Sequence, residues 1–406
     1  MRSRILWIGV LAIAVSISAC NTTDLAEEAT APAESELAPA NGEPIPGQYI
    51  VVLKDDGVAA KTRRDMVDAY EAYPGVDMNH KYVHTIAGFS GQLTPAALAA
   101  LQNDPAVDYI EEDRWVSLPP FEIQGGNDVH GFPKPDNPGG KPGGGGDDGG
   151  GDPAQSVPWG ISRVNGGGAY SGSGVAWVLD SGIDLDHADL NVDTGRSVSM
   201  LGGKEANNPD DQNGHGTHVA GTIAAVDNGI GVIGVAPGAT VISVRVLDRR
   251  GSGSYSGVIA GIDHVGANGS NGDVANMSLG GGKSQSVNDA VVAAAATGVK
   301  FYLAAGNESQ NADNVSPAST NAANVWTICA TTNGDGWASY SNYGPSVDFC
   351  EPGSGIESTW KSGGYNTISG TSMATPHAAG LGLLGAIRLE TGVIAGPDRD
   401  YDLGVH

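Results

Sequence analysis

The segment GVAWVLDSGID, residues 174–184, contains the feature that decides the fold. Five apolar residues run without a polar break, end at Asp180, and are followed by a turn that contains glycine. An apolar run of this length without alternation predicts a strand buried on both faces, as in parallel sheets covered by helices. Further runs of this kind are TVISVRVLD (240–248), DVANMSLG (273–280), VKFYLAAG (299–306) and VWTICAT (325–331). Since Ala-rich stretches of helical character alternate with such runs, residues 157–406 are predicted to form an α/β domain.

The preceding residues divide into four segments by composition. Residues 1–19 combine a basic start with an apolar run, which is typical of an export signal. Residues 20–47 are rich in Ala, Pro and Glu and are predicted to be a disordered tether. Residues 48–118 show strand and helix patterns in a βαββαβ-like order, which predicts a small α+β domain. Residues 119–156 are rich in Gly and Pro and are predicted to be a linker.

Cys20 leaves two interpretations of the N-terminus open. The tetrad Ile17-Ser18-Ala19-Cys20 resembles the bacterial lipobox, in which the cysteine is acylated. An ordinary signal cleaved after Ala19 fits as well, because small residues at these positions suit either processing enzyme. In both cases we expect the chain to be exported to the periplasm, the cell surface or the surroundings.

The charge balance excludes several classes of partner. The net charge of −25 repels phosphate backbones and anionic membranes, so nucleic acid is not an expected partner.

The three cysteines are too few for a disulfide scaffold and lack the CxxC spacing of a structural zinc site.

Three polar residues stand where an apolar element meets a Gly-rich turn. Asp180 follows a strand, His215 begins a helical pattern in NGHGTHVAGTIAAV, and Ser372 does so in SGTSMATPHAAGLGLL. A serine hydroxyl needs an imidazole to take its proton, and the imidazole needs a carboxylate to hold its tautomer. Acyl transfer also requires donors for the developing oxyanion, for which Asn307 and the Ser372 backbone N–H are candidates.

The strings VLDSGID, GHGTHVAGT, AAGNE and GTSMATPHAAG, in that order, resemble the signature blocks of the subtilisin-like serine proteases, most nearly the proteinase K branch. Residues 48–118 are similar to the inhibitor propeptide of these enzymes. The resemblance implies a subtilisin-like parallel sheet flanked by helices and a self-inhibited serine endopeptidase. It assigns the nucleophile to Ser372, the base to His215, the orienting acid to Asp180 and an oxyanion donor to Asn307.

By the same resemblance the substrate is a polypeptide that binds by strand addition between residues 249–256 and 278–281. We expect the chain to be a monomer whose own propeptide is its intramolecular inhibitor. The implied substrate-binding residues are Gly253, Tyr255, Ser278, Leu279, Gly280, Ala304 and Gly306.

The resemblance also implies a structural calcium ion at Asp348, with main-chain carbonyls near Ala323 and Val325 as partners; a surface aspartate without metal is the alternative. Cys329 and Cys350 lie on segments that this fold places on neighbouring strands. They are expected to form a disulfide, with two buried thiols as the alternative.

Other interpretations of these residues stay open. His215 and His218 have an H-x-x-H spacing, but the glutamate of the zinc motif H-E-x-x-H is missing, and His218 and His377 are better explained as packed helix residues. Arg249 and Arg250 favour either acidic substrate residues or a solvated turn. A binding protein that has lost catalysis, and an acid-acting relative with a Glu/Asp/Ser set, are the alternative function classes.

Pro119 and Pro120 follow the predicted inhibitor domain. Proline lacks the backbone N–H that strand addition uses, so cleavage is expected further along the linker.

Overall fold

The computed structural model describes residues 40–55, 57–118 and 154–406. The predicted export signal, Cys20, residues 20–39 of the tether and residues 119–153 of the linker lie outside the described residues. Within the described ranges, no helix combines the length and apolar character needed to cross a membrane.

Residues 40–118, the N-terminal domain, form the predicted βαββαβ unit. Its elements are β1 (Pro44–Leu53), α1 (Ala60–Asp68), β2 (Val76–Tyr82), β3 (Gly88–Leu93), α2 (Pro95–Leu101) and β4 (Val107–Ser117). The four strands lie in the order β2-β3-β1-β4. Strand β1 begins at Pro44, within the last residues of the predicted tether. Pro44 pairs with Arg114 of β4, and this long-range pairing is invisible in the local composition.

Residues 154–406, the C-terminal domain, form the predicted α/β domain. Its helices are α3 (Trp159–Arg163), α4 (His215–Ala224), α5 (Tyr255–Asn268), α6 (Gln285–Ala295) and α7 (Thr371–Leu384), with short 3₁₀ turns at Gly203–Glu205 and Ala312–Asn314. Its strands are β5 (Ala176–Asp180), β6 (Val198–Ser199), β7 (Val241–Arg245), β8 (Ser252–Ser254), β9 (Val274–Met277), β10 (Gly281–Gly282), β11 (Lys300–Ala304), β12 (Val315–Ser316), β13 (Val325–Thr332), β14 (Gly336–Trp337), β15 (Phe349–Pro352), β16 (Ile356–Trp360), β17 (Gly364–Ile368), β18 (Arg388–Ala395) and β19 (Asp400–Val405).

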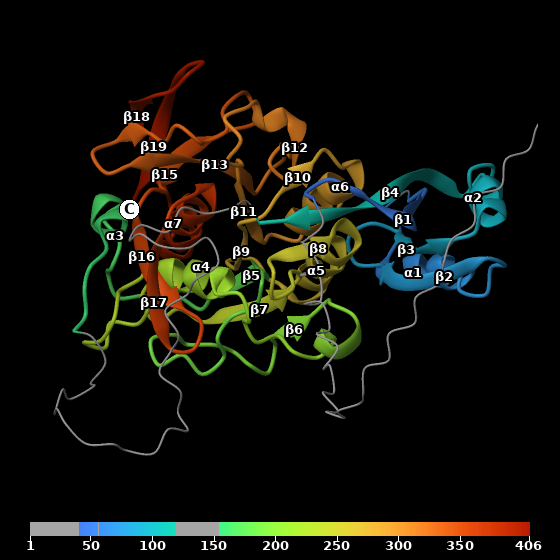
Figure 1. The fold of residues 1–406 in the computed structure, drawn as a ribbon, viewed down its shortest axis with the longest axis horizontal. Helices are drawn as coiled ribbons and strands as arrows, with labels where there is room; N and C mark the ends of the chain where they lie inside the picture. The colour runs from blue at the N-terminus through green and yellow to red at the C-terminus, as the bar shows by residue number, and fades with distance from the viewer. Residues whose placement is uncertain (1–39, 56, 119–153) are drawn as a thin grey trace, which may run out of the picture. The chain divides into compact units, whose positions relative to one another are not determined.

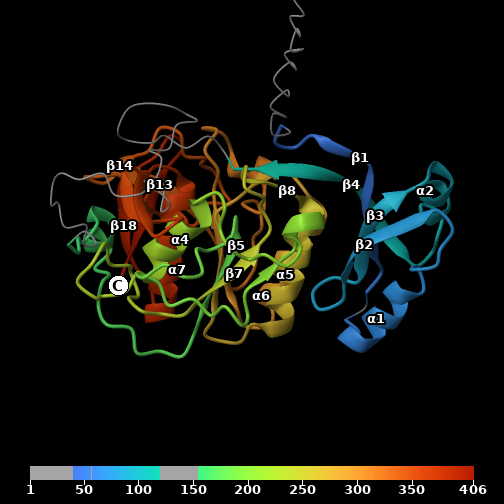
Figure 2. The same cartoon turned by 60° about the horizontal axis from the view of Figure 1, so that its bottom comes forward.

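The main sheet has the strand order β18-β19-β15-β13-β11-β9-β5-β7-β6. Its central pairs are parallel, while the last hairpin, β18–β19, is antiparallel. Figures 1 and 2 show the central strands between the helix pair α4 and α7 and the helix pair α5 and α6. Trp177 and Leu179 pack in the core cluster of α5 and α6, whereas Ala176 and Val178 pack in that of α4 and α7. The unbroken apolar run of β5 follows from this burial on both faces.

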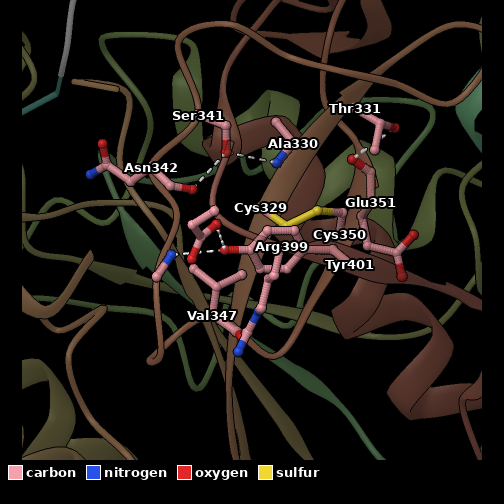
Figure 3. The surroundings of a disulfide bond; sticks show 12 residues. Cys329, Ala330, Thr331, Ser341, Asn342, Val347, Cys350, Glu351, Arg399 and Tyr401 are labelled. Atoms are coloured by element: carbon pink, nitrogen blue, oxygen red, sulfur yellow. Dashed lines mark hydrogen bonds between the residues drawn. A yellow bond between two sulfur atoms is a disulfide. The ribbon is translucent and has the colours of Figure 1, made fainter. Parts of the chain in front are cut away.

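Cys329 and Cys350 form the predicted disulfide. They lie opposite each other on the parallel neighbours β13 and β15, as Figure 3 shows. Both cysteines are fully buried. The bond therefore ties two adjacent strands of the main sheet from inside the core.

The first described residue of the C-terminal domain, Ala154, lies two residues before the predicted end of the linker at residue 156. Ala154 pairs with Ile230, and Ser156 pairs with Val232. The end of the predicted linker is thus part of the folded domain.

Candidate active site

Asp180 and His215 meet at the carboxyl end of β5. The Asp180 Oδ1 and Oδ2 atoms lie 2.9 and 3.0 Å from His215 Nδ1. Both side chains are almost fully buried. Asp180 Oδ1 also accepts a hydrogen bond from the Ser181 backbone N–H at 2.7 Å, which holds the carboxylate in place. A carboxylate that accepts a hydrogen bond from Nδ1–H keeps the proton on Nδ1, so Nε2 is the ring nitrogen that can take a further proton.

His215 stands at the first position of α4 because the preceding residue is glycine. Gly214 has a φ of 114°, in the region that residues with a side chain rarely adopt. A Cβ atom at this position would also lie 2.2 Å from the Trp360 ring. Gly214 therefore allows the chain to turn tightly into the helix and to present His215 to Asp180.

Ser372 lies in the first turn of α7, where backbone N–H groups have no partner within the helix. Pro376 has no N–H to donate to the Ser372 carbonyl four residues earlier. The Ser278 hydroxyl donates to that carbonyl instead, at 2.8 Å. In return, the Ser372 hydroxyl donates to the Ser278 carbonyl at 3.1 Å. These two bonds fix the start of α7 against the segment that follows β9.

Asn307 lies beside Ser372 and is oriented by the same helix start. Its Oδ1 accepts hydrogen bonds from the Thr371 backbone N–H at 2.8 Å and from the Thr371 hydroxyl at 2.9 Å. With the oxygen occupied in this way, the Nδ2 group is the part of the amide that can donate a further hydrogen bond.

A pocket opens at Ser372. Its lining consists of Leu279, Gly280, Ala304, Gly306, Asn307, Glu308, Val315, Thr371 and Ser372. Four of the predicted substrate-binding residues are in this set, whereas Gly253, Tyr255 and the fully buried Ser278 are not.

The sequence interpretation missed Glu308. Its Oε2 accepts a hydrogen bond from Asn342 Nδ2 at 2.7 Å, which holds the carboxylate in the pocket lining. Its position directly after Asn307 was the sequence feature that could have identified it as a pocket residue.

Strand β8 carries one rim of the site and pairs with the N-terminal domain. Val116 lies opposite Gly253 in an antiparallel pairing of β4 with β8. The Leu118 backbone N–H continues this pairing by donating to the Gly251 carbonyl at 2.8 Å. Tyr255 begins α5 with a buried side chain, and its hydroxyl donates to the Gly282 carbonyl. The N-terminal domain thus supplies an extended strand to the rim on which Gly253 was predicted to bind substrate.

Two carboxylates of β4 bind the starts of helices α5 and α6. Asp113 Oδ1 accepts from the Ser256 backbone N–H at 3.0 Å, and Oδ2 accepts from the Ser256 hydroxyl at 2.5 Å. Glu111 accepts from the backbone N–H groups of Gln285 at 2.7 Å and Ser286 at 3.2 Å. Anionic groups are stabilised at helix N-termini, where N–H groups lack partners. These two residues belong to the string YIEED, but the sequence around that string did not indicate that they bind the starts of α5 and α6.

Asp263 of α5 is a carboxylate of the C-terminal domain that binds backbone groups of the N-terminal domain. Its Oδ1 accepts from the backbone N–H groups of His84 and Thr85, each at 2.8 Å. The Tyr82 hydroxyl donates to the Ser256 carbonyl at 3.0 Å. The two domains are therefore joined by hydrogen bonds to the carboxylates of Glu111, Asp113 and Asp263 in addition to the strand pairing.

Three further residues that the sequence analysis considered, His218, His377 and Arg250, make contacts of their own. His218 Nε2 bonds to the Ile356 carbonyl, and His377 Nδ1 bonds to the Met373 carbonyl, so both are packed histidines as expected. Burial lowers the pKa of His218 to about 3 and that of His377 to about 4. Arg250 pairs with Asp248 of its own turn, with Nη2 and Oδ2 3.0 Å apart, which favours the solvated-turn interpretation.

Asp348 is the residue that was expected to bind calcium. Its Oδ2 accepts a hydrogen bond from the Thr327 backbone N–H at 2.7 Å, and burial raises the pKa of the carboxyl. The described parts of the chain contain no group of three or more His, Cys, Asp or Glu side chains that could hold a metal. A cation at Asp348 would consequently need main-chain carbonyls as its other ligands.

Comparisons with known proteins agree with this geometry. Residues 172–385 match the Subtilase family, and residues 48–119 match the Peptidase inhibitor I9 family. The chain is 40% identical to alkaline serine exoprotease A of Vibrio alginolyticus over 374 residues, which are 87% of this chain and 63% of that protein. It is 40% identical over 317 residues to the subtilisin-like serine protease AsES of Sarocladium strictum, with 74% and 71% of the two chains covered. It is 37% identical over 352 residues to a cuticle-degrading protease of Metarhizium anisopliae, with 83% and 79% covered. Among solved structures, a cold adapted subtilisin-like serine proteinase matches with a TM-score of 0.53 and 40% identity, covering 60% of this chain and 96% of that chain.

Proposed function

Because the chain belongs to the subtilase family of serine proteases, we propose that it is an exported endopeptidase that cleaves proteins with Ser372, His215 and Asp180 and is made as a self-inhibited precursor. The observation that carries the proposal is the buried pair of Asp180 and His215 in the same domain as Ser372, which stands at a helix start beside Asn307.

In the proposed reaction, the Ser372 hydroxyl leaves the Ser278 carbonyl and gives its proton to His215 Nε2 as its oxygen attacks the substrate carbonyl. Asp180 holds the Nδ1–H tautomer and stabilises the imidazolium that forms. Asn307 Nδ2 and the Ser372 backbone N–H donate to the oxyanion, and His215 then returns the proton to the leaving amine. Water repeats the sequence on the acyl-enzyme and releases the second product.

The substrate of this reaction is proposed to be an extended polypeptide. The pairing of β4 with β8 supports this, because a strand of the N-terminal domain already adds to the rim in that manner. The pocket lined by Gly280, Ala304 and Gly306 is proposed to take the side chain before the cleaved bond, while Gly253 and Tyr255 contact residues further upstream. The same domain contact supports the role of residues 48–118 as an intramolecular inhibitor.

The triad is tested with a fluorophosphonate probe on the purified full chain. We expect covalent labelling at Ser372 that is lost in Ser372→Ala and in His215→Ala, together with loss of precursor cleavage in Ser372→Ala. Cleavage of the Ser372→Ala chain in a protease-free system, or labelling in the His215→Ala variant at the wild-type rate, contradicts the proposal.

Two finer parts of the proposal concern calcium and export. Calcium bound by Asp348 with the carbonyls of Ala323 and Val325 would stabilise the surface without entering the reaction. Chelator should then lower the melting temperature of the wild type but not that of Asp348→Asn.

The apolar start of residues 1–19 supports export, and mass spectrometry of the N-terminal fragment distinguishes acylated Cys20 from an unmodified residue.

A further inference from the structure

The segment just before β1 reaches the second rim of the site. Asn41 Nδ2 donates to the Gly280 carbonyl at 3.0 Å, and Asn41 Oδ1 accepts from the Ser117 backbone N–H at 3.3 Å. Gly280 lines the pocket at Ser372, and Ser117 belongs to the β4 strand that pairs with β8. The Asn41 side-chain amide therefore lies between β4, here called the inhibitor strand, and the rim formed by residues 278–281, which faces β8.

The backbone around Asn41 holds this amide in place. Residues 40–43 form a turn in which the Glu43 N–H donates to the Ala40 carbonyl at 3.1 Å. Gly42 supplies the positive φ, 84°, that the third position of such a turn can require. The Gly42 N–H donates to the Trp115 carbonyl at 2.8 Å, and the Trp115 N–H donates to the Glu43 carbonyl at 2.9 Å. The turn is thus fixed to β4 two residues before Ser117.

The rim is shaped to receive the amide. A Cβ atom on Gly281 would lie 2.7 Å from Asn41 Oδ1 and 2.5 Å from the Tyr255 hydroxyl oxygen, so a side chain at residue 281 would clash with both. The absence of a side chain at Gly281 leaves the space that Asn41 occupies.

The bridge changes how the inhibitor strand lies in the cleft. Strand addition normally joins neighbouring strands by direct backbone hydrogen bonds, as β4 and β8 show. At the other rim, the Asn41 amide lies between the Ser117 N–H and the Gly280 carbonyl and bonds to both. The strand is therefore paired directly on one side and separated by a side-chain amide on the other.

We propose that Asn41 is a positioning residue that slows the first, intramolecular cleavage of the precursor. By bridging Ser117 and Gly280, it holds the end of the inhibitor strand away from the second rim and from the pocket that begins there. Residues 40–43 thereby extend the inhibitor beyond residues 48–118. This inference rests on the proposed function, because it concerns the rate of a cleavage that Ser372 performs.

The test compares the full chain with Asn41→Ala and Asn41→Asp. The alanine removes both bonds, whereas the aspartate keeps an acceptor for Ser117 and loses the donor to Gly280. After refolding, the first-order disappearance of the precursor is followed at several protein concentrations, since a rate independent of concentration identifies cleavage within one chain. We expect both variants to cleave several-fold faster than the wild type. Asn103→Ala removes a side-chain amide that donates to the Ala99 carbonyl within the N-terminal domain, and this control should cleave at the wild-type rate.

Two further measurements separate the possible outcomes. Each variant is also made with Ser372→Ala, and its melting temperature shows whether a faster rate merely reflects a destabilised N-terminal domain. Faster cleavage without a lower melting temperature than that of Asn103→Ala supports the role of Asn41. An unchanged or slower rate, or acceleration only with a matching loss of stability, overturns it. If the wild-type chain itself is not cleaved while it binds the fluorophosphonate at Ser372, the precursor scheme fails independently of Asn41.

Discussion

Buried acidic groups have different surroundings at the contact between the two domains and in the layer formed by β15 and α7. At the contact, Asp113 is almost fully buried and accepts two hydrogen bonds from Ser256 at the start of α5. In the layer, Glu351 is fully buried, and neither of its carboxylate oxygens has a hydrogen-bond partner among the described residues. Figure 3 shows Glu351 next to Cys350, with its carboxylate turned away from the disulfide.

The pKa directions follow from this difference. Burial raises the pKa of Asp113, and the bonds from Ser256 oppose that rise. Burial raises the pKa of Glu351 well above its ordinary value, with only the charge of Arg163 opposing it. The desolvation cost is therefore opposed by hydrogen bonds from a helix start at the domain contact, whereas no hydrogen bond among the described residues opposes it at Glu351. We expect the domain contact to tolerate a charged carboxylate better than the layer of β15 and α7 does.

The largest expected effect is that of Asp113→Ala at the domain contact. The substitution removes two hydrogen bonds to a charged group and leaves the Ser256 N–H without its partner. We expect a loss of about 4 kcal/mol, equivalent to about 1000-fold faster hydrogen exchange at the Ser256 amide in the Ser372→Ala chain. Glu112→Ala is the control, because Glu112 is an exposed residue of the same strand. Equal exchange in the two variants would show that the buried carboxylate does not stabilise the contact.

The second expected effect is acid sensitivity caused by His377 of α7. Its Nδ1 bonds to the Met373 carbonyl, and its Nε2 is buried without a hydrogen-bond partner among the described residues. Burial lowers the pKa from 6.5 to about 4, so the unfolded chain binds a proton more readily than the folded one. The stability that depends on neutral His377 is thus present above pH 6.5 and is lost as the pH falls through 4. The loss is roughly 3 kcal/mol.

Urea unfolding of the Ser372→Ala chain at pH 7 and pH 4 measures this effect. His377→Gln should lose less stability than its parent over the same interval, because the amide does not titrate. A parallel decline in both chains would assign the acid sensitivity to other groups.

The positions of Asp180, His215 and Ser372 in the fold could be predicted from the sequence because each one stands in a local pattern. A strand, a turn and a helix start occur within a few residues of Asp180, His215 and Ser372, and these short-range features place the side chains. The order of elements in the N-terminal domain was predictable for the same reason. The contacts of Asn41 and the burial of Glu351 could not be predicted in this way. Asn41 lies in a polar segment that resembled a tether, and its partners are 76 and 239 residues away along the chain.

Glu351 illustrates a second limit of sequence interpretation. In the string DFCEPG, a glutamate before Pro-Gly has the appearance of a surface residue at a strand end. It is buried because β19 adds to β15, with Leu403 opposite Cys350, and Glu351 Oε1 then lies against the backbone of Gly404. Local composition cannot report a burial that a distant hairpin creates.

The smallest expected effect is that of Glu351→Gln, and it has the opposite pH dependence from that of His377. Because the folded chain holds a proton on Glu351 above the unfolded value of 4.5, the stability of the wild type should fall as the pH rises from 4.5. Glutamine has the same shape and no proton to lose, so its variant should not show this decline. At pH 8 we expect Glu351→Gln to be more stable by roughly 1–2 kcal/mol in the Ser372→Ala chain, and near pH 4 we expect the two chains to be equal. Urea unfolding at both values measures the difference, with the exposed Glu112→Gln as the control. A wild type that is more stable than Glu351→Gln at pH 8 would mean that the buried carboxylate is stabilised there, and that the two regions treat buried charge alike.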